Sequence, residues 1–203
     1  MTGQVVDRAI EQGDAVLMRQ VAEGSEAAFR LVAQRHLPRM LRLASKTLGG
    51  SSSAGDAEDV VQEALVRLWQ HAGNWQPQRG ALSTWLYTVV YRLCVDRLRL
   101  KPTVALDEAI EVADSQPHAL DTMMRAGEFK ALDTAIAALQ PRQRAALTLF
   151  YYEEMSGPEA ASVLGLGLRA FWSLLHRARQ AVHEEMKSVL RQQAISQSKG
   201  SMS

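Results

Sequence analysis

Hydrophobic residues recur every three or four positions along most of this 203-residue chain. Apolar positions at this spacing lie on one face of an α-helix. In the first part of the chain they include Val16, Leu17, Val21, Phe29, Leu31, Val32, Leu37, Met40, Leu41 and Leu43. The apolar/polar alternation of a β-strand is not visible, and no segment repeats. The pattern therefore predicts an all-α fold.

Two later segments carry this pattern most clearly. Residues 56–70 place Val60, Ala64 and Leu68 on one face, and acidic residues fill the first turn, where the helix dipole favours negative charge. Residues 81–100 show a second stripe at helical spacing. Both segments are predicted to be amphipathic helices that pack against a common core.

The breaks between the helices differ in composition. Glycine and serine fill 49–55, and glycine, asparagine and proline mark 71–80, so both are predicted to be loops. Residues 102–124 hold five acidic residues and no Lys or Arg. Residues 1–101 carry 13 Lys and Arg against 10 Asp and Glu, and residues 125–203 carry 10 against 7. We therefore predict two small helical domains joined by a flexible acidic linker.

The second domain contains the sharpest local signal. Ser156 and Glu159 form a capping box at the start of a short helix, Gly165 permits a tight turn, and a long helical segment begins at Leu168. A helix-turn-helix has this form, and its second helix enters the DNA major groove. An ordinary helical hairpin has the same spacing. The second helix carries basic residues that favour DNA binding: Arg169, His176, Arg177 and Arg179.

No set of residues is arranged for catalysis or for metal binding. The single cysteine, Cys94, excludes an internal disulfide, and the five histidines lack ligand spacing. The sequence has neither an apolar run long enough to cross a bilayer nor a signal peptide. We therefore expect a cytoplasmic protein that is not an enzyme, needs no cofactor or metal and does not insert directly into membranes.

Several segments, in order, resemble the extracytoplasmic-function (ECF) sigma factors of the sigma-70 family. They are DAVLMRQVAEG at 14–24, DAEDVVQEALVRLW at 56–69, GALSTWLYTVVYRLCVDRLR at 80–99, LQPRQR at 139–144 and HRAR at 176–179. Each motif alone is moderately specific, but their order and separation are characteristic of the family. The resemblance covers most of residues 14–186.

The resemblance implies a division of labour along the chain. Residues 10–100 form a region 2-like domain that binds core RNA polymerase and recognises and melts the −10 element. Residues 101–125 form the linker, which either threads the polymerase's basic channel or is a solvated tether. Residues 126–190 form a region 4-like helix-turn-helix domain that reads the −35 element, and residues 191–203 form a flexible tail.

By the same resemblance, three groups of residues are candidate contacts. The expected core-polymerase contacts are Asp56, Asp59, Gln62, Glu63 and Arg67. The expected −10 contacts are Tyr91, Arg92, Asp96, Arg97 and Arg99, with the 73–80 loop able to cup a flipped base. The expected −35 contacts are Arg142, Arg144, Arg169, Trp172, Ser173, His176, Arg177 and Arg179. For all of them the alternative is an ordinary solvated surface.

The burial of several aromatic, aliphatic and sulfur-containing side chains can also be predicted. Trp69 and Trp85 are expected in the core, and Cys94 is expected to be a small packing residue. Phe171 and Leu174 are predicted to face inward from the second helix of the helix-turn-helix. Two roles are open for Trp172: it either contacts DNA or a partner protein from the surface, or packs in the core.

The recognition helix departs from the commoner family pattern. Relatives commonly carry threonine, lysine and arginine where this chain has Ala170, Trp172 and Leu174, whereas the Ser-Leu-Leu triplet at 173–175 resembles a variant subgroup. The promoter sequence of the commoner members therefore does not transfer to this chain.

The resemblance also implies partners: core RNA polymerase, promoter DNA and an inhibitory anti-sigma factor. It suggests a nucleoid-associated protein that acts in a stress or envelope-signal response. Two other functions remain open at this point. One is a stand-alone helix-turn-helix transcriptional regulator, and the other is a helical adaptor that does not bind DNA.

Overall fold

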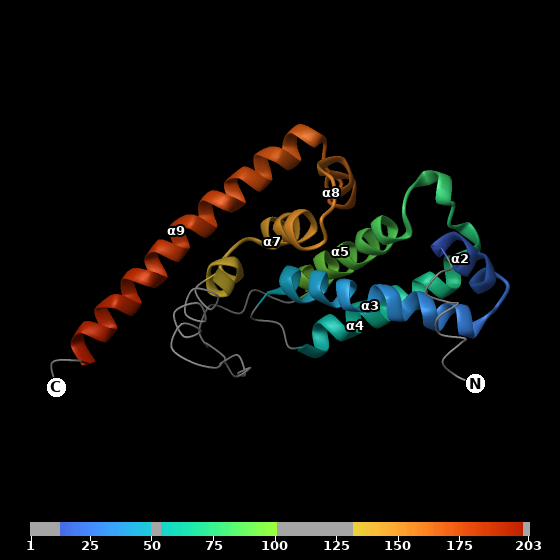
Figure 1. The fold of residues 1–203 in the computed structure, drawn as a ribbon, viewed down its shortest axis with the longest axis horizontal. Coiled ribbons are helices and arrows are strands. Elements are labelled where there is room, and N and C mark those ends of the chain that lie inside the picture. The colour runs from blue at the N-terminus through green and yellow to red at the C-terminus, as the bar shows by residue number, and fades with distance from the viewer. Residues whose placement is uncertain (1–12, 50–53, 101–131, 201–203) are drawn as a thin grey trace.

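A computed structural model describes residues 13–49, 54–100 and 132–200 of the chain, and every regular element in those ranges is helical (Figure 1). The N-terminal module holds α2 (Asp14–Ala22), α3 (Glu26–Leu48), α4 (Ala54–His71), η1 (Ala72–Asn74), η2 (Pro77–Arg79) and α5 (Leu82–Leu100). The C-terminal module holds a short helix at 132–137, then α7 (Pro141–Leu147), η3 (Thr148–Tyr152), α8 (Gly157–Val163) and α9 (Leu168–Gly200). The all-α prediction is confirmed for these residues. The predicted linker, 101–125, lies outside them.

Helix α3 is the centre of the N-terminal module, and α2, α4 and α5 all pack against it. It begins where the Ser25 hydroxyl accepts a hydrogen bond from the Ala28 amide, an N-cap that satisfies a free helix donor. Its inner face is fully buried at Val32, Met40 and Leu43. It ends at Gly49, whose φ of 81° is a conformation that glycine adopts without strain. The core of the module is therefore built around one long amphipathic helix.

The segment predicted as a loop at 71–80 folds into two 3₁₀ turns, η1 and η2, between α4 and α5. Pro77 opens η2, where a proline costs no hydrogen bond, and Gly80 ends it with a φ of 141°. The two turns give this connection a defined shape. They also bring it beside the start of α5.

In the C-terminal module, Gln140 and Gln143 form a capping box at the start of α7, and η3 continues α7 as a π-helix. Phe171 and Ala178 on α9 are fully buried, and the prediction that Phe171 and Leu174 face inward is confirmed. Helix α9 continues to Gly200, beyond the expected boundary at residue 190.

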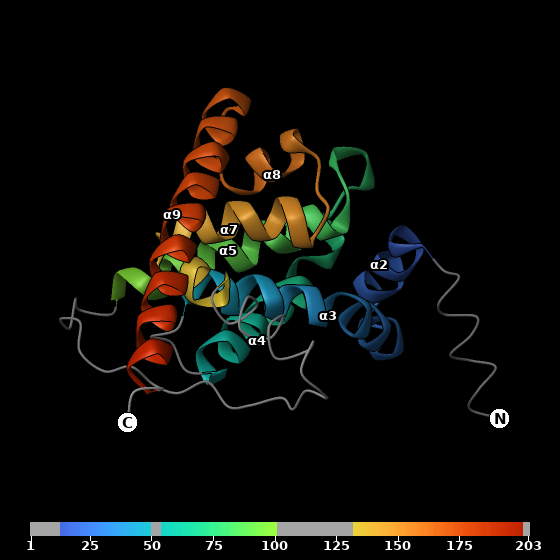
Figure 2. The same cartoon turned by 60° about the vertical axis from the view of Figure 1, so that its left-hand side comes forward.

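The two modules are closed against each other. Helix α7 and η3 lie on α3, and α8 lies on α5, so the buried apolar cluster continues from one module into the other. Helix α4 lies on the other side of α3 and α5, away from α7 and α8 (Figures 1 and 2). None of the helices in the described ranges is long and apolar enough to span a membrane.

Cys94, the one cysteine of the sequence, lies inside the N-terminal module. Its side chain is fully buried, and its Sγ lies 4.0 Å from the carbonyl oxygen of Ala44 on α3. Burial raises the pKa of the thiol to about 12. The expected packing role of Cys94 is confirmed.

Candidate nucleic-acid and polymerase interface

Helix α4 presents a mainly polar face to solvent, interrupted by the exposed Val66. Its apolar stripe, Val60, Ala64 and Leu68, is buried, so Asp59, Gln62 and Glu63 are turned outward. Glu63 also pairs within the helix, since Arg67 of the candidate set donates to its Oε1 at 2.6 Å from one turn away. The exposed acids on α4 form a surface that another protein can contact.

Arg97 of α5 joins this helix to its neighbour. Its Nε donates to Asp56 Oδ1 at 3.0 Å, and its Nη2 donates to Asp59 Oδ2 at 2.6 Å. These carboxylates, Asp59 first, raise the pKa of the Arg97 guanidinium. Asp56 and Arg97, which are predicted contacts of polymerase and DNA respectively, also hold α4 against α5.

Trp69, near the end of the same helix, is more exposed than predicted. The residue is 39% exposed, and its ring meets that of Phe29 edge-on, with ring centroids 5.3 Å apart. The prediction of a core position is therefore wrong. The reason is that Trp69 follows Leu68, the last residue of the buried stripe, by a rotation that turns it toward solvent.

The candidate −10 residues on α5 divide into two sets. Arg92, Asp96 and Arg99 are exposed, whereas Tyr91 is only 8% exposed. Burial raises the pKa of the Tyr91 phenol, and the nearby charge of Arg142 partly opposes that rise. Arg142 belongs to the C-terminal module, so the side of α5 that carries Tyr91 faces that module.

A cavity of about 460 Å³ lies between the 71–80 connection and the start of α5. Trp75 and Trp85 are both half-buried in its lining, together with Asn74, Arg79 and Thr88. Trp85 was expected in the core, and it instead stands at the wall of this cavity. Ser162 of α8 also lines it, so the C-terminal module closes one side.

The helix-turn-helix has the predicted geometry. The Ser156 hydroxyl accepts from the Glu159 amide at 3.4 Å, and Glu159 Oε2 accepts from the Ser156 amide at 2.9 Å. These hydrogen bonds lower the pKa of Glu159. Gly165 makes the turn with a φ of 62°. On α9, the residues predicted to face DNA are exposed: Arg169, Trp172, Ser173, His176, Arg177 and Arg179.

Comparisons with known proteins match both modules. The sigma-70 region 2 family model matches residues 32–101, and the sigma-70 region 4 model matches residues 129–182. The chain is 31% identical over 172 residues to the ECF RNA polymerase sigma factor SigM of Mycobacterium tuberculosis, covering 83% of this chain and 82% of that protein. This chain belongs to the ECF sigma factors. It directs promoter-specific initiation of transcription, which excludes the stand-alone regulator and the adaptor.

Two solved structures share the fold of this sigma factor. The complex of CnrH with the cytosolic domain of CnrY matches with a TM-score of 0.64 and 24% identity, covering 87% of this chain and 99% of CnrH. The sigma factor RpoE bound to the anti-sigma factor NepR, from Bartonella quintana, matches with a TM-score of 0.57 and 24% identity. This match covers 77% of this chain and 96% of the matched chain. Both likenesses extend over the two modules.

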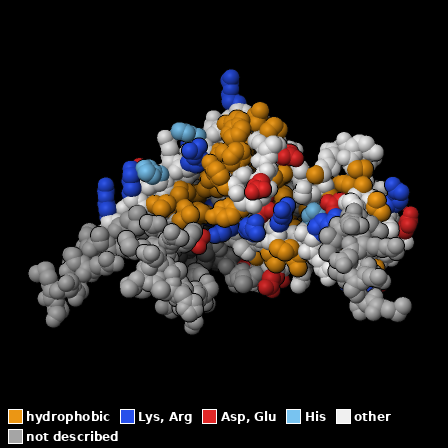
Figure 3. Space-filling view, viewed as in Figure 1, with side chains coloured by type: hydrophobic (Ala, Val, Ile, Leu, Met, Phe, Trp, Pro, Cys, Tyr) orange, Lys and Arg blue, Asp and Glu red, His pale blue; other side chains and the backbone are white. Residues whose placement is uncertain are grey.

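Trp172 of the sigma factor occupies a position between the two predicted roles. Its ring packs against Phe150 and Phe171, with centroid distances of 5.4 and 5.3 Å, yet 44% of the residue is exposed. Exposed apolar side chains gather over this part of the C-terminal module (Figure 3). Trp172 therefore stabilises the helix-turn-helix and also contributes to its outer surface.

Gly157 lies directly beneath the Trp172 indole. A Cβ at this glycine would lie 2.5 Å from Cζ2 of the ring, which no real contact allows. We expect Gly157→Ala to lower the free energy of unfolding by about 1–3 kcal/mol, because the indole is forced out of its packing. Urea denaturation measures this loss. The added variant Trp172→Leu should recover part of it, and equal losses in the single and double variants would contradict the clash.

Arg144, one of the predicted −35 contacts, is buried in this structure, unlike the predicted contacts on α9. It is only 7% exposed, and its guanidinium donates to the carbonyl oxygens of Lys46 at 2.8 Å, Thr47 at 2.8 Å and Leu48 at 3.2 Å. Within its own module it donates to Ala137 at 3.0 Å and to Leu139. Burial lowers the pKa of the guanidinium. Arg144 therefore joins the modules, while Arg142 stays exposed and donates to the Leu164 carbonyl at 3.0 Å.

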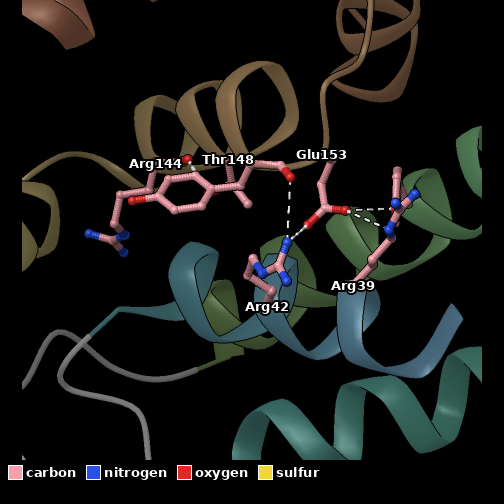
Figure 4. A network of polar contacts seen from close by, with 7 residues as sticks. Arg39, Arg42, Arg144, Thr148 and Glu153 are labelled. Carbon is pink, nitrogen blue, oxygen red and sulfur yellow. Dashed lines mark hydrogen bonds and ion pairs between the residues drawn. The ribbon is translucent and has the colours of Figure 1, made fainter.

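Glu153 is a residue that the sequence did not single out. Its carboxylate is fully buried between the modules, 3.1 Å from Arg42 Nη1 and 3.7 Å from Arg39 Nε (Figure 4). The Tyr87 hydroxyl donates at 2.9 Å to Glu153 Oε2, the oxygen that Arg39 also faces. Burial, and then the charge of Glu153, raise the pKa of Tyr87. Glu153 and the adjacent Glu154 follow an aromatic-rich segment and gave no sequence signal, because the partners of Glu153 lie far away in the chain.

Proposed function

We propose that this ECF sigma factor divides its task among three surfaces. The exposed face of α4, with Asp59, Gln62 and Glu63, docks on core RNA polymerase. Helix α5 and the 71–80 connection read and melt the −10 element, and α9 reads the −35 element. The observation that carries the proposal is the outward polar face of α4 on the same chain as an exposed, capped helix-turn-helix.

Melting requires a place for a base that leaves the duplex. The cavity beside Trp75 and Trp85 offers aromatic walls, and aromatic side chains stack on any base. Arg92 and Arg99 are exposed on α5, where they can neutralise phosphates of the displaced strand. We therefore assign capture of an unstacked −10 base to this cavity.

Reading of the −35 element falls to the first turns of α9. Arg169, Ser173 and His176 are exposed there and carry donors suited to base edges in the major groove. Arg177 and Arg179 follow on the same helix and suit phosphates better. The exposed edge of Trp172 is placed to contact a sugar or a thymine methyl group.

The proposal also includes the regulation and the cellular location of the protein. Of the two solved neighbours, CnrH is bound to the cytosolic domain of CnrY, and RpoE is bound to the anti-sigma factor NepR. We propose that an anti-sigma factor likewise controls this chain in a stress or envelope-signal response. The polymerase carries out the chemistry, so the sigma factor is not itself an enzyme. It works in the cytoplasm, on nucleoid DNA.

Run-off transcription tests the proposed function. The reaction combines purified core polymerase, this sigma factor and the DNA upstream of its own operon. We expect one discrete transcript that requires both proteins. A transcript pattern identical to that of core polymerase alone would overturn the proposal.

The two classes of arginine on α9 should behave differently. Arg169→Ala should cost about 1–3 kcal/mol of −35 binding and relax preference at one base pair. Arg179→Ala should weaken binding to all sequences alike and reduce the slope of log K against log salt by roughly one unit. Fluorescence anisotropy with a matched set of point-substituted duplexes at several salt concentrations separates the two. Identical salt slopes and base preferences in both variants would contradict the assignment.

A further inference from the structure

Two large apolar side chains are exposed where α9 begins. Leu168 and Trp172 lie one turn apart on this helix and are 45% and 44% exposed. The surrounding residues 168–180 include three arginines and no Asp or Glu. Neither apolar side chain can neutralise a phosphate as these arginines can. The two side chains therefore suit a different kind of contact from the arginines around them.

The Trp172 indole is held in one position by the residues behind it. Its ring meets Phe150 and Phe171 at centroid distances of 5.4 and 5.3 Å, with interplanar angles of 80° and 62°. Gly157 lies so close that a Cβ there would be 2.5 Å from Cζ2 and 3.0 Å from Cη2 of the ring. A side chain that is fixed before binding loses little conformational freedom when it binds. Trp172 therefore offers a rigid apolar surface to a partner.

The position of Trp172 around α9 groups it with the residues proposed to read bases. Four exposed residues share one arc of about 100° on a helix with 3.6 residues per turn: Arg169, Trp172, Ser173 and His176. Leu168 and the two arginines assigned to phosphates, Arg177 and Arg179, lie outside this arc. The fully buried Phe171 also lies outside it, on the side of the core. Trp172 therefore faces the base edges of the groove together with the residues that read them.

The thymine methyl group is the apolar feature of the major groove. Guanine, cytosine and adenine present hydrogen-bonding atoms there, whereas thymine adds a C5-methyl group to its O4 acceptor. A polar base edge placed against the indole loses its water without gaining a hydrogen bond, which costs free energy. A methyl group placed there instead leaves water favourably. The indole at residue 172 therefore favours thymine.

We propose that Trp172 is a specificity-determining residue of this sigma factor, whose indole packs against the C5-methyl group of one thymine in the −35 element. The proposal rests on the proposed reading of that element by α9. It selects between the two contacts that are open to the exposed edge of the ring, the sugar and the methyl group.

Deoxyuridine scanning tests this contact on the unmodified protein. Deoxyuridine differs from thymidine only in lacking the C5-methyl group. The probe is duplex DNA from upstream of the protein's own operon, with each thymine of the −35 region replaced in turn. Fluorescence anisotropy measures binding of the holoenzyme, formed by the sigma factor and core polymerase. We expect one replacement to weaken binding about fourfold, which corresponds to about 0.8 kcal/mol for one buried methyl group. A scan without any sensitive thymine would refute the proposal and would favour a protein partner for the indole.

Two variants show whether Trp172 reads the sensitive thymine. Trp172→Ala should bind the thymine and deoxyuridine duplexes equally well, because the group that contacts the methyl is gone. Tyr151→Ala is the matched control, since it removes an exposed ring that packs on Phe150 in the same aromatic cluster but lies on η3. This control should keep the loss of about fourfold seen in the wild type. The same loss in Trp172→Ala would contradict the assignment.

Folding and the proposed function are tested separately from this contact. Circular dichroism compares the folding of the variants. Trp172→Lys is a second variant that keeps a long side chain against Phe150, and it should lose the sensitivity to deoxyuridine as well. If α9 does not read the −35 element at all, base-pair substitutions in that region and Arg169→Ala leave holoenzyme binding unchanged. If α9 reads the element without Trp172, those effects remain and only the deoxyuridine scan is flat.

Discussion

Reversing Asp59 and Glu63 to lysine is expected to weaken binding to core RNA polymerase by about 3 kcal/mol, roughly a hundredfold in affinity. Both acids lie on the outward face of α4, and like charges set against a complementary surface are strongly unfavourable. Helicity should survive, because the pairs with Arg97 and Arg67 are exposed ion pairs worth about 1 kcal/mol or less each. Biolayer interferometry against immobilised core polymerase measures the loss.

The control for this variant is a double reversal with the same change in net charge. Glu23→Lys, at the C-cap of α2, and Glu184→Lys, on α9, alter exposed acids away from the α4 face. They should leave the affinity for polymerase within about twofold of the wild type. Comparable losses in the two double variants would refute α4 as the docking surface, and circular dichroism confirms that both remain folded.

Replacing Arg144 with alanine is expected to have the largest effect on stability. The change removes the donor for five carbonyl oxygens in two modules, and the free energy of unfolding should fall by about 3 kcal/mol. For a chain of this size, such a loss lowers Tm by roughly 6–12 °C. Differential scanning calorimetry measures it, and the variant should show two separated transitions as the modules lose their contact.

Arg142→Ala is the matched comparison. Arg142 lies two residues before Arg144 but is exposed and donates to a single carbonyl, so its loss should cost about 1 kcal/mol. A similar fall in Tm for both variants would show that the buried position of Arg144 contributes nothing special.

Helix periodicity and local capping were enough to predict most of the fold. The stripe of Val60, Ala64 and Leu68 is buried as expected, and the Ser156–Glu159 capping box is formed. These features depend on residues three or four positions apart, so they are visible in a single sequence. The helix ends were predicted less accurately. Helix α4 begins at Ala54 and not at residue 56, so Ala54 and Gly55 belong to the helix and not to the predicted loop.

The contact between the modules could not be predicted. Arg144 binds carbonyls nearly a hundred positions earlier, and Glu153 meets Arg42 across 111 positions. No local spacing encodes such pairs, and an arginine in a basic helix-turn-helix domain resembles a DNA contact until its burial is known. The family resemblance assigned candidate surfaces to helices, but it could not distinguish an outward arginine such as Arg142 from an inward one such as Arg144.

The burial of Cys94 determines how this sigma factor can respond to oxidants. Thiol oxidation proceeds through the thiolate, and a thiol with a pKa near 12 and no exposed surface is almost entirely protonated at neutral pH. The Cys94 thiol of the folded protein is therefore not reactive toward peroxide. A cell that places this regulon under oxidative control therefore cannot use the Cys94 thiol of the folded sigma factor as the sensor.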